Sequence, residues 1–234
     1  MGQCDIVLTH VPNFDGNGRD LDIHIRTTIR HDYSFIESAA VKVGQDILEV
    51  TGFGAYVVNG VAGALGVNHS GVPDLGGYPI FHTPVNKKKH TFDIVLGPQE
   101  NITISTFKDI VAVSIDAGKE SQHYFQDTVG LMGTYNGSLL ARDGVAVMED
   151  MNALGQEWQV TDKDPKLFVV DRAPQYPTKC MMPSPRKTEQ RRLGETIARR
   201  AAEQACSHVS GQKFENCVMD VLAIGDLEIA ESYD

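Results

Sequence analysis

The sequence predicts a mainly β protein, an antiparallel two-sheet β-sandwich followed by a small α-helical C-terminal segment. From Cys4 to about Asp116, short β-branched and aromatic runs are separated by Gly, Asn and Pro, which is typical of antiparallel sandwiches. Beyond residue 186 the apolar residues recur at helical spacing instead. With 234 residues, of which 41% are hydrophobic and 22% charged, the chain is globular and long enough to bury a core.

Individual strands follow from a two-residue alternation in the β region. Leu21, Ile23 and Ile25 alternate with polar residues, so they predict a strand with one face in the core. Residues 91–107 predict two paired strands, because apolar runs flank a turn that contains Gly and Pro. Residues 111–115 have the same period and predict a further strand.

The region from residue 130 to 160 is predicted to form Gly-rich loops with a short strand at residues 157–160. Trp158 is the only tryptophan, and its large apolar ring favours a position in the core. Glu149 and Asp150 are adjacent in the sequence and are interpreted as solvated loop residues.

Two short helices are predicted at the C-terminus, after a connection with several prolines at residues 162–185. Apolar or small residues recur at helical spacing in residues 195–209 and again in residues 214–222. Cys206 and Cys217 lie on these two stripes. A disulfide between the helices would therefore stabilise a unit too small to be held by its core alone.

The charge distribution restricts the classes of partner. A formal charge of −10 argues against nucleic acid, whose binding needs clustered Lys and Arg. The one basic run, Lys87-Lys88-Lys89, predicts a solvated hairpin tip. No apolar stretch approaches the ~20 residues that span a bilayer, so no membrane insertion is expected of this segment. The N-terminal residues lack the apolar run of a signal peptide.

Two motifs give the chain a family resemblance. Residues 130–137 are Gly-Leu-Met-Gly-Thr-Tyr-Asn-Gly, and residues 152–160 are Asn-Ala-Leu-Gly-Gln-Glu-Trp-Gln-Val. This pair resembles the Gly-Leu-Cys-Gly-Asn-x-Asn-Gly loop and the Asn-x-Phe-Gly-x-x-Trp-x-Val strand of von Willebrand factor type D domains. Residues 3–8 resemble the early strand of the same family. The resemblance implies a type D-like sandwich domain over residues 1–180 and a reduced, Cys-containing helical module over residues 186–234.

The chain departs from the family pattern in two places. Met132 stands where the family has a loop cysteine, and the usual opening segment, with Gly-Asp-Pro-His and a Thr-Phe-Asp-Gly turn, does not precede the early strand. The first strand is therefore expected to be missing. By the same resemblance, Cys4 is expected to form a disulfide with Cys180.

The resemblance also implies a possible Ca²⁺ site in the loop that follows residue 130. Thr134 and Asn136 occupy the positions of the family's loop ligands, and Asp143 would supply a carboxylate, the kind of hard oxygen ligand that Ca²⁺ prefers. The alternative is that Asn136 merely forms a turn. Residues 15–22 resemble one copy of a calcium-binding repeat, but a single copy is half a site, so a polar loop is expected there.

No catalytic residue is predicted. The histidines show no His-x-His or His-x-x-x-His spacing for a metal, and Ser70 is not in a nucleophile elbow. Surface or edge positions are therefore predicted for His24, His31, His69, His82, His90, His123 and His208.

Three N-glycosylation sequons begin at Asn68, Asn101 and Asn136, and they are consistent with a secreted glycoprotein. The resemblance implies a non-catalytic extracellular or cell-surface module, part of a larger secreted or membrane-anchored adhesive or matrix protein with a protein or matrix partner. The alternative is a hydrolase whose metal or acid–base site is assembled from dispersed His and Asp residues.

Overall fold

The structure is a computed structural model of the chain. It describes residues 4–30, 33–63, 72–118, 122–168 and 199–233.

The chain divides into two compact units. The larger one comprises residues 1–28 and 35–181, and the smaller one residues 29–34 and 182–234. Each is described by itself below.

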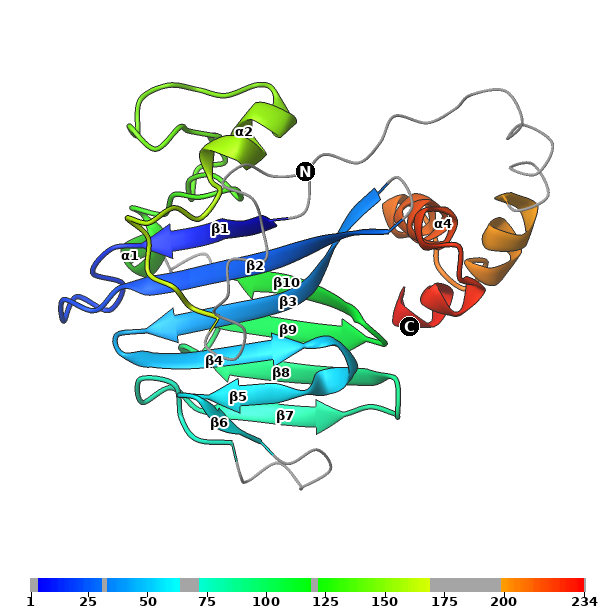
Figure 1. The fold of residues 1–234 in the computed structure, drawn as a ribbon, viewed down its shortest axis with the longest axis horizontal. Coiled ribbons are helices and arrows are strands. Elements are labelled where there is room, and N and C mark those ends of the chain that lie inside the picture. Colours follow the sequence, from blue (N-terminus) through cyan, green and yellow to red (C-terminus); the bar gives the residue numbers. More distant parts are fainter. Residues whose placement is uncertain (1–3, 31–32, 64–71, 119–121, 169–198, 234) are drawn as a thin grey trace. The chain divides into compact units, whose positions relative to one another are not determined.

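Two antiparallel sheets form the larger unit and confirm the predicted mainly β fold (Figure 1). The six-stranded sheet has the order β1-β2-β3-β4-β5-β6, with β1 Cys4–Val11, β2 Leu21–Arg30, β3 Tyr33–Val43, β4 Asp46–Thr51, β5 Tyr56–Val58 and β6 Val61–Ala62. The four-stranded sheet has the order β10-β9-β8-β7, with β7 Ile80–Pro84, β8 Lys89–Val95, β9 Asn101–Phe107 and β10 Ile110–Asp116. The short 3-10 turn η1, Gly52–Gly54, joins β4 to β5.

Alternating side chains from both sheets form one core. Ile23 and Ile25 of β2 belong to the same buried cluster as Ile94 of β8 and Ile102 and Ile104 of β9. Burying a side chain of this size contributes about 1.5–3 kcal/mol. The predicted hairpin also forms, because β8 pairs with β9 in antiparallel register.

Two segments that follow the strands lie along the free edge of β1. The amide of Val7 donates to the carbonyl of Trp158 at 2.8 Å, and His10 and Val129 exchange backbone hydrogen bonds. These contacts bring both motifs of the family resemblance to the same strand. They also satisfy backbone groups that an open sheet edge would leave unpaired.

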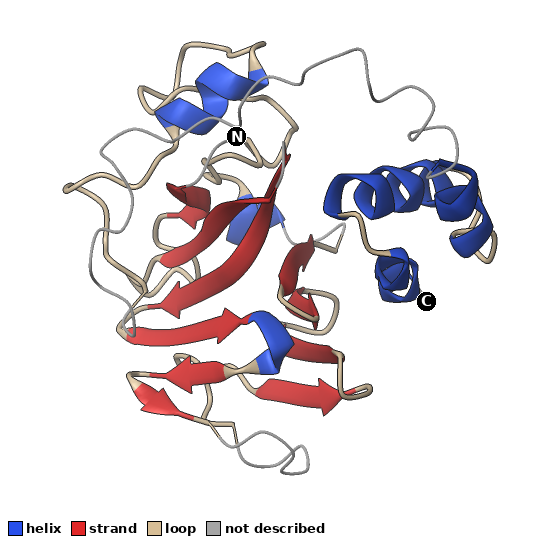
Figure 2. Ribbon diagram, turned by 45° about the vertical axis from the view of Figure 1, so that its right-hand side comes forward, coloured by secondary structure: helices blue, strands red, loops and turns tan. Residues whose placement is uncertain are grey.

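Residues 157–160 differ from the strand that the sequence predicts. Glu157 is the last residue of the helix α2, Met151–Glu157, and within the segment only Gln159 forms a β-bridge, with Ile6. The helix begins at Met151 because the Asp150 carboxylate accepts hydrogen bonds from the amides of Asn152 and Ala153, an N-cap. Glu149 and Asp150 are exposed loop residues, as predicted. Figure 2 shows α2 and the shorter α1, Gln122–Phe125, beside the strands.

The smaller unit contains the ends of β2 and β3 and a helical C-terminal part. Residues 199–205 are helical, followed by α4 (Gln212–Ile224) and the 3-10 segment η2 (Leu227–Tyr233). The first helix ends earlier than predicted because residues 206–209 form hydrogen-bonded turns instead. No helix in the described ranges is long and apolar enough to cross a membrane.

Candidate functional site

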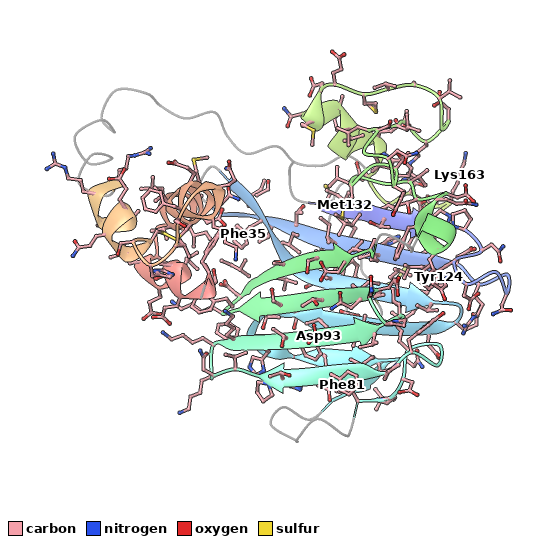
Figure 3. All side chains as sticks on the ribbon, turned by 180° about the vertical axis from the view of Figure 1, so that it is seen from behind. Phe35, Phe81, Asp93, Tyr124, Met132 and Lys163 are labelled. Atoms are coloured by element: carbon pink, nitrogen blue, oxygen red, sulfur yellow. A yellow bond between two sulfur atoms is a disulfide. The ribbon has the colours of Figure 1, made fainter. Side chains whose placement is uncertain are left out.

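The loop after β10 that carries the family resemblance is fitted closely to β1. The amides of Leu131 and Met132 both donate to carbonyls of β1, those of Val7 and Leu8. Gly130 has φ +129°, and a Cβ atom there would lie 2.6 Å from the Leu8 carbonyl oxygen. Only glycine fits this approach. The side chain of Met132, at the position of the family's loop cysteine, is exposed and is labelled in Figure 3.

The three predicted calcium ligands lie in two consecutive turns. The Thr134 hydroxyl accepts from the Ser138 amide at 3.0 Å, with exposed Asn136 at the tip of that turn. In the next turn the Asp143 carboxylate accepts from the amides of Val145 and Ala146. These two backbone hydrogen bonds hold the pKa of Asp143 below its usual value. Two of the three candidates thus stabilise turns, and Asp143 is the one carboxylate of the set.

Metal-ligand residues do not gather elsewhere in the part of the chain that the structure describes. No group of three or more His, Cys, Asp or Glu side chains there is placed to hold a metal ion. In the loop at residues 15–22, the guanidinium of Arg19 pairs with the Asp15 carboxylate and donates to the Gly76 carbonyl. The polar loop predicted for this stretch is confirmed. The positively charged group at its centre is the Arg19 side chain.

Arg142 connects the loop to the tryptophan motif. Its guanidinium donates to the carbonyls of Glu157 and Gln159, pairs with Asp164 at 2.9 Å, and lies 4.9 Å from the Trp158 ring centre. Trp158 is 4% exposed, as predicted for a core residue, and its indole N–H donates to the Leu140 carbonyl. Through these contacts Arg142 links its own loop to the tryptophan segment and to Asp164.

A row of charged side chains occupies the outer face of the six-stranded sheet. His10 Nδ1 lies 2.7 Å from Asp22 Oδ1, and Lys42 Nζ lies 3.0 Å from the other oxygen of the same carboxylate. Burial alone would raise the pKa of Asp22, but the hydrogen bonds from His10 and Lys42 outweigh it and lower the pKa. The hydrogen bond to Asp22 raises the pKa of His10. Nearby, Arg26 forms a two-point ion pair with Asp5.

His10 has one of the two contacts that a general base needs, a carboxylate hydrogen-bonded to its imidazole. A carboxylate that holds Nδ1 leaves Nε2 able to take a proton. Among the described residues, however, no hydroxyl or thiol is hydrogen-bonded to this imidazole, whose recorded partner is Asp22. The sequence reasoning missed this pair. The two-residue period of β2 places Asp22 outward, but only the register with β1 brings His10 opposite it.

His24 lies in the same row and is 1% exposed, which contradicts the surface position predicted for it. Its Nε2 has no hydrogen-bond partner among the described residues. Burial lowers the pKa of His24 to about 4. The outer face is covered because Leu167 and Phe168 pack on Ala40, and Arg26 lies 4.3 Å from the Phe168 ring centre.

His90 is also buried, on the inner strand β8, contrary to the predicted surface or edge position, whereas His82 lies on the edge strand β7, as the prediction allows, with its side chain buried. The hairpin of β7 and β8 brings them together, with His82 Nε2 3.1 Å from His90 Nδ1 and the two rings stacked. His82 also stacks on Phe92 at 4.4 Å between ring centres. Burial lowers the pKa of His90. The pair is buried, and the contact between the two rings provides a partner for one nitrogen of each.

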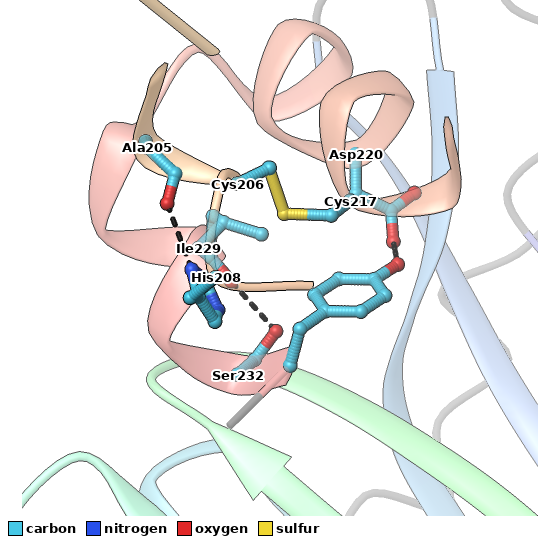
Figure 4. Close-up of a disulfide and its surroundings, with 8 residues drawn as sticks. Ala205, Cys206, His208, Cys217, Asp220, Ile229 and Ser232 are labelled. Carbon is cyan, nitrogen blue, oxygen red and sulfur yellow. Dashed lines mark hydrogen bonds between the residues drawn. A yellow bond between two sulfur atoms is a disulfide. The ribbon is translucent and has the colours of Figure 1, made fainter. Parts of the chain in front are cut away.

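A disulfide joins the helices of the smaller unit, as predicted. Cys206 and Cys217 are bonded with their Cα atoms 6.0 Å apart (Figure 4). The Tyr233 hydroxyl donates to the Asp220 carboxylate at 2.5 Å. Burial and this hydrogen bond raise the pKa of Tyr233. His208 is exposed, as predicted, and lies beside the Ala205 carbonyl.

The structure describes only some of the remaining residues that were singled out in the sequence. Cys4 is disulfide-bonded, but its predicted partner Cys180 lies outside the described residues, as do Asn68, His31, His69 and Ser70. Asn136 is exposed on its turn, and Asn101 is half-buried at the start of β9.

No protein-family model matches this sequence, and a search of curated proteins returns no match.

Proposed function

We propose that this chain is a non-catalytic extracellular module with a binding or structural role, part of a larger adhesive or matrix protein related to type D domains. The observation that carries the proposal is the state of the cysteines. Cys206 and Cys217 form a disulfide, and Cys4 is disulfide-bonded as well. Disulfides persist in oxidising compartments and are rare in the cytosol.

The positions of the two resemblance motifs support the family part of the proposal. The glycine loop and the tryptophan segment are both far from Val7 in sequence, yet both form backbone hydrogen bonds with this residue of β1. Such a shared dependence is expected if the two motifs belong to one structural unit, as they do in type D domains.

The use of the polar side chains supports a non-catalytic role. Asp22, the most buried carboxylate of the outer row, is shared between His10 and Lys42. Both oxygens of the Asp22 carboxylate are thus engaged within the protein, which leaves this carboxylate little capacity to bind a substrate.

The experiment that tests the proposal is peptide mapping of the protein from its natural source, without reduction and with free thiols blocked during lysis. We expect a Cys206–Cys217 cross-linked peptide and a second cross-link from Cys4, in the extracellular or cell-surface fraction. A parallel sample that is reduced before blocking is the control. Recovery from the cytosol with four blocked thiols would contradict the proposal and favour the hydrolase alternative.

A further inference from the structure

The outer face of the four-stranded sheet carries a row of mostly polar side chains. The register places Phe81, Asp93, Thr103 and Ser114 side by side in one row across the four strands. Figure 3 shows this sheet from its outer side, with Phe81 and Asp93 labelled. Phe81 is the exception in the row, because it is aromatic and 46% exposed on the edge strand β7.

We infer that an N-linked glycan on Asn101 lies across this outer face and covers Phe81 with its first sugars. The inference rests on the proposed function, since it requires passage through a secretory pathway. It goes beyond that function by naming an N-linked glycan as the group that covers this sheet face.

Asn101 is placed to carry a glycan in the folded protein. It is the first residue of β9, directly after the β8–β9 turn, and it faces outward together with Thr103. Between them, Ile102 points inward and is fully buried. Both recognition residues of the sequon are therefore partly exposed on the outer face, and a bulky group on Asn101 points away from the core.

A chain of hydrogen bonds leads from Asn101 towards Phe81. The Asn101 amide nitrogen lies 3.5 Å from the Thr103 hydroxyl oxygen, and this hydroxyl donates to Asp93 at 2.6 Å. Asp93 is the direct cross-strand neighbour of Phe81. From strand spacing and rise per residue, Asn101 and Phe81 are separated by about 12 Å, which the first two sugars of an N-linked glycan can span.

The chemistry of the modification is compatible with these contacts. The Asn101 side-chain nitrogen forms a bond to the anomeric carbon of a lipid-diphosphate-linked oligosaccharide. The bond from that carbon to the diphosphate oxygen breaks, the lipid diphosphate leaves, and the nitrogen loses one proton. One N–H remains on the amide nitrogen and can still donate to Thr103.

The glycan would also change the properties of the edge. An edge strand can pair with strands of other chains, and an exposed aromatic side chain on it adds apolar area to such a contact. The apolar face of a sugar ring can pack on Phe81, while its hydroxyls find acceptors and donors in Asp93 and Thr91. The glycan then shields the surface on which copies of the chain would otherwise associate.

The test uses the full chain with an added secretion signal, expressed in glycosylating animal cells. Asn68→Gln and Asn136→Gln leave Asn101 as the single sequon. We expect the secreted protein to carry a glycan at Asn101, seen as conversion of this residue to aspartate by peptide-N-glycosidase. Thr103→Val should abolish occupancy, and the matched Thr103→Ser variant should retain it.

The contact with Phe81 has its own readout. Removing the glycan from the native protein should lower its melting temperature by about 2 °C, the shift expected for roughly 1 kcal/mol in a domain of this size. The same treatment of a Phe81→Ala variant should lower it by less than half as much. The deglycosylated wild-type background should also self-associate more than its Phe81→Ala counterpart.

Three results would overturn the inference. A secreted chain with its disulfides formed but with Asn101 unmodified contradicts it and leaves the proposed function intact. An equal melting shift with and without Phe81 contradicts the sugar–aromatic contact. A chain recovered with free thiols and no glycan contradicts the proposed function and this inference together.

Discussion

In the sandwich, two sheets bury a large apolar cluster that includes Ile94 and Ile102, whereas the helical unit buries fewer apolar side chains, such as Val221 and Ile229, beside the Cys206–Cys217 disulfide. The first arrangement gains stability mainly from apolar area, and the second adds to a small core the restriction that its disulfide places on the unfolded chain. The comparison shows that one chain can hold two regions by different physical means. Each means has its own point of failure.

The largest effect is expected from Trp158→Ala, which removes a 4%-exposed indole from the sandwich core. Large-to-small changes of this kind cost about 3–5 kcal/mol. The free energy of unfolding of the sandwich, measured by urea titration, should fall by this amount. Trp158→Phe is the control and should lose about 1 kcal/mol, for the hydrogen bond to Leu140. Faster amide exchange in α4 as well would show that the two regions unfold together.

The converse change is Cys206→Ser with Cys217→Ser. The bridged residues are 11 apart in sequence, and the loop-entropy relation gives about 3 kcal/mol for a bridge of this length. Hydrogen exchange of the α4 amides should accelerate strongly, with β8 and β9 unchanged. Met219→Ala, an exposed change on the same helix, is the control and should have little effect. Unchanged exchange in α4 would mean that its core suffices without the disulfide.

The third test concerns the pH dependence of the sandwich. The pKa of His24 in the folded protein is about 4, below its ordinary value of 6.5. Between these pH values the unfolded chain binds a proton at His24 and the folded protein does not. The free energy of unfolding of the protein therefore falls as the pH decreases from 6.5 to 4, by at most about 3 kcal/mol. His24→Leu should remove this decrease, as measured by urea midpoints at pH 7 and pH 4.5.

Other groups titrate in the same row, so the His24 test needs a comparison. The raised pKa of His10 acts in the opposite sense, because its contribution is lost as the pH rises through that pKa. The lowered pKa values of Asp22 and Asp164 act at a more acidic pH. These contributions are present in both the wild type and the His24→Leu variant, so they cancel when the pH dependence of one is subtracted from that of the other. Equal pH slopes for wild type and variant would show that His24 is not buried as described.

The smallest effect is expected from calcium. The loop offers one carboxylate, Asp143, together with Thr134 and Asn136, and so few charged ligands favour weak binding. Five millimolar Ca²⁺ should raise the melting temperature relative to chelator by only about 1–3 °C. Asp143→Ala should abolish the difference between Ca²⁺ and chelator. Comparing the melting temperatures of both proteins in chelator separates this effect from the loss of the turn that Asp143 stabilises. No shift in the wild type would remove Ca²⁺ from the account.

The sequence predicts the strands well where the alternation is regular. Ile23 and Ile25 identify β2, and the turn between β8 and β9 identifies their hairpin. It fails at α2, because Gly155 lowers helix propensity and the capping role of Asp150 is visible only with its backbone partners.

The candidate site is predicted less completely than the fold. His82 and His90 meet only through the register of β7 and β8. His24 is buried because residues 161–168, distant in sequence, cover what would otherwise be the solvated face of a strand. Alternation within one strand carries no information about such covering segments.

The contacts of Arg142 have a consequence for how this sequence can diverge. Its guanidinium donates to the main-chain carbonyls of residues 157 and 159, while its main-chain amide donates to the Glu157 carboxylate. The two guanidinium hydrogen bonds therefore do not depend on which side chains stand at these positions, whereas the contact with the Glu157 carboxylate does. Arg142 itself has no such freedom, because a lysine ammonium cannot serve two carbonyls, a carboxylate and an indole face at once. A relative could differ at most visible positions of the motif and still depend on this one arginine.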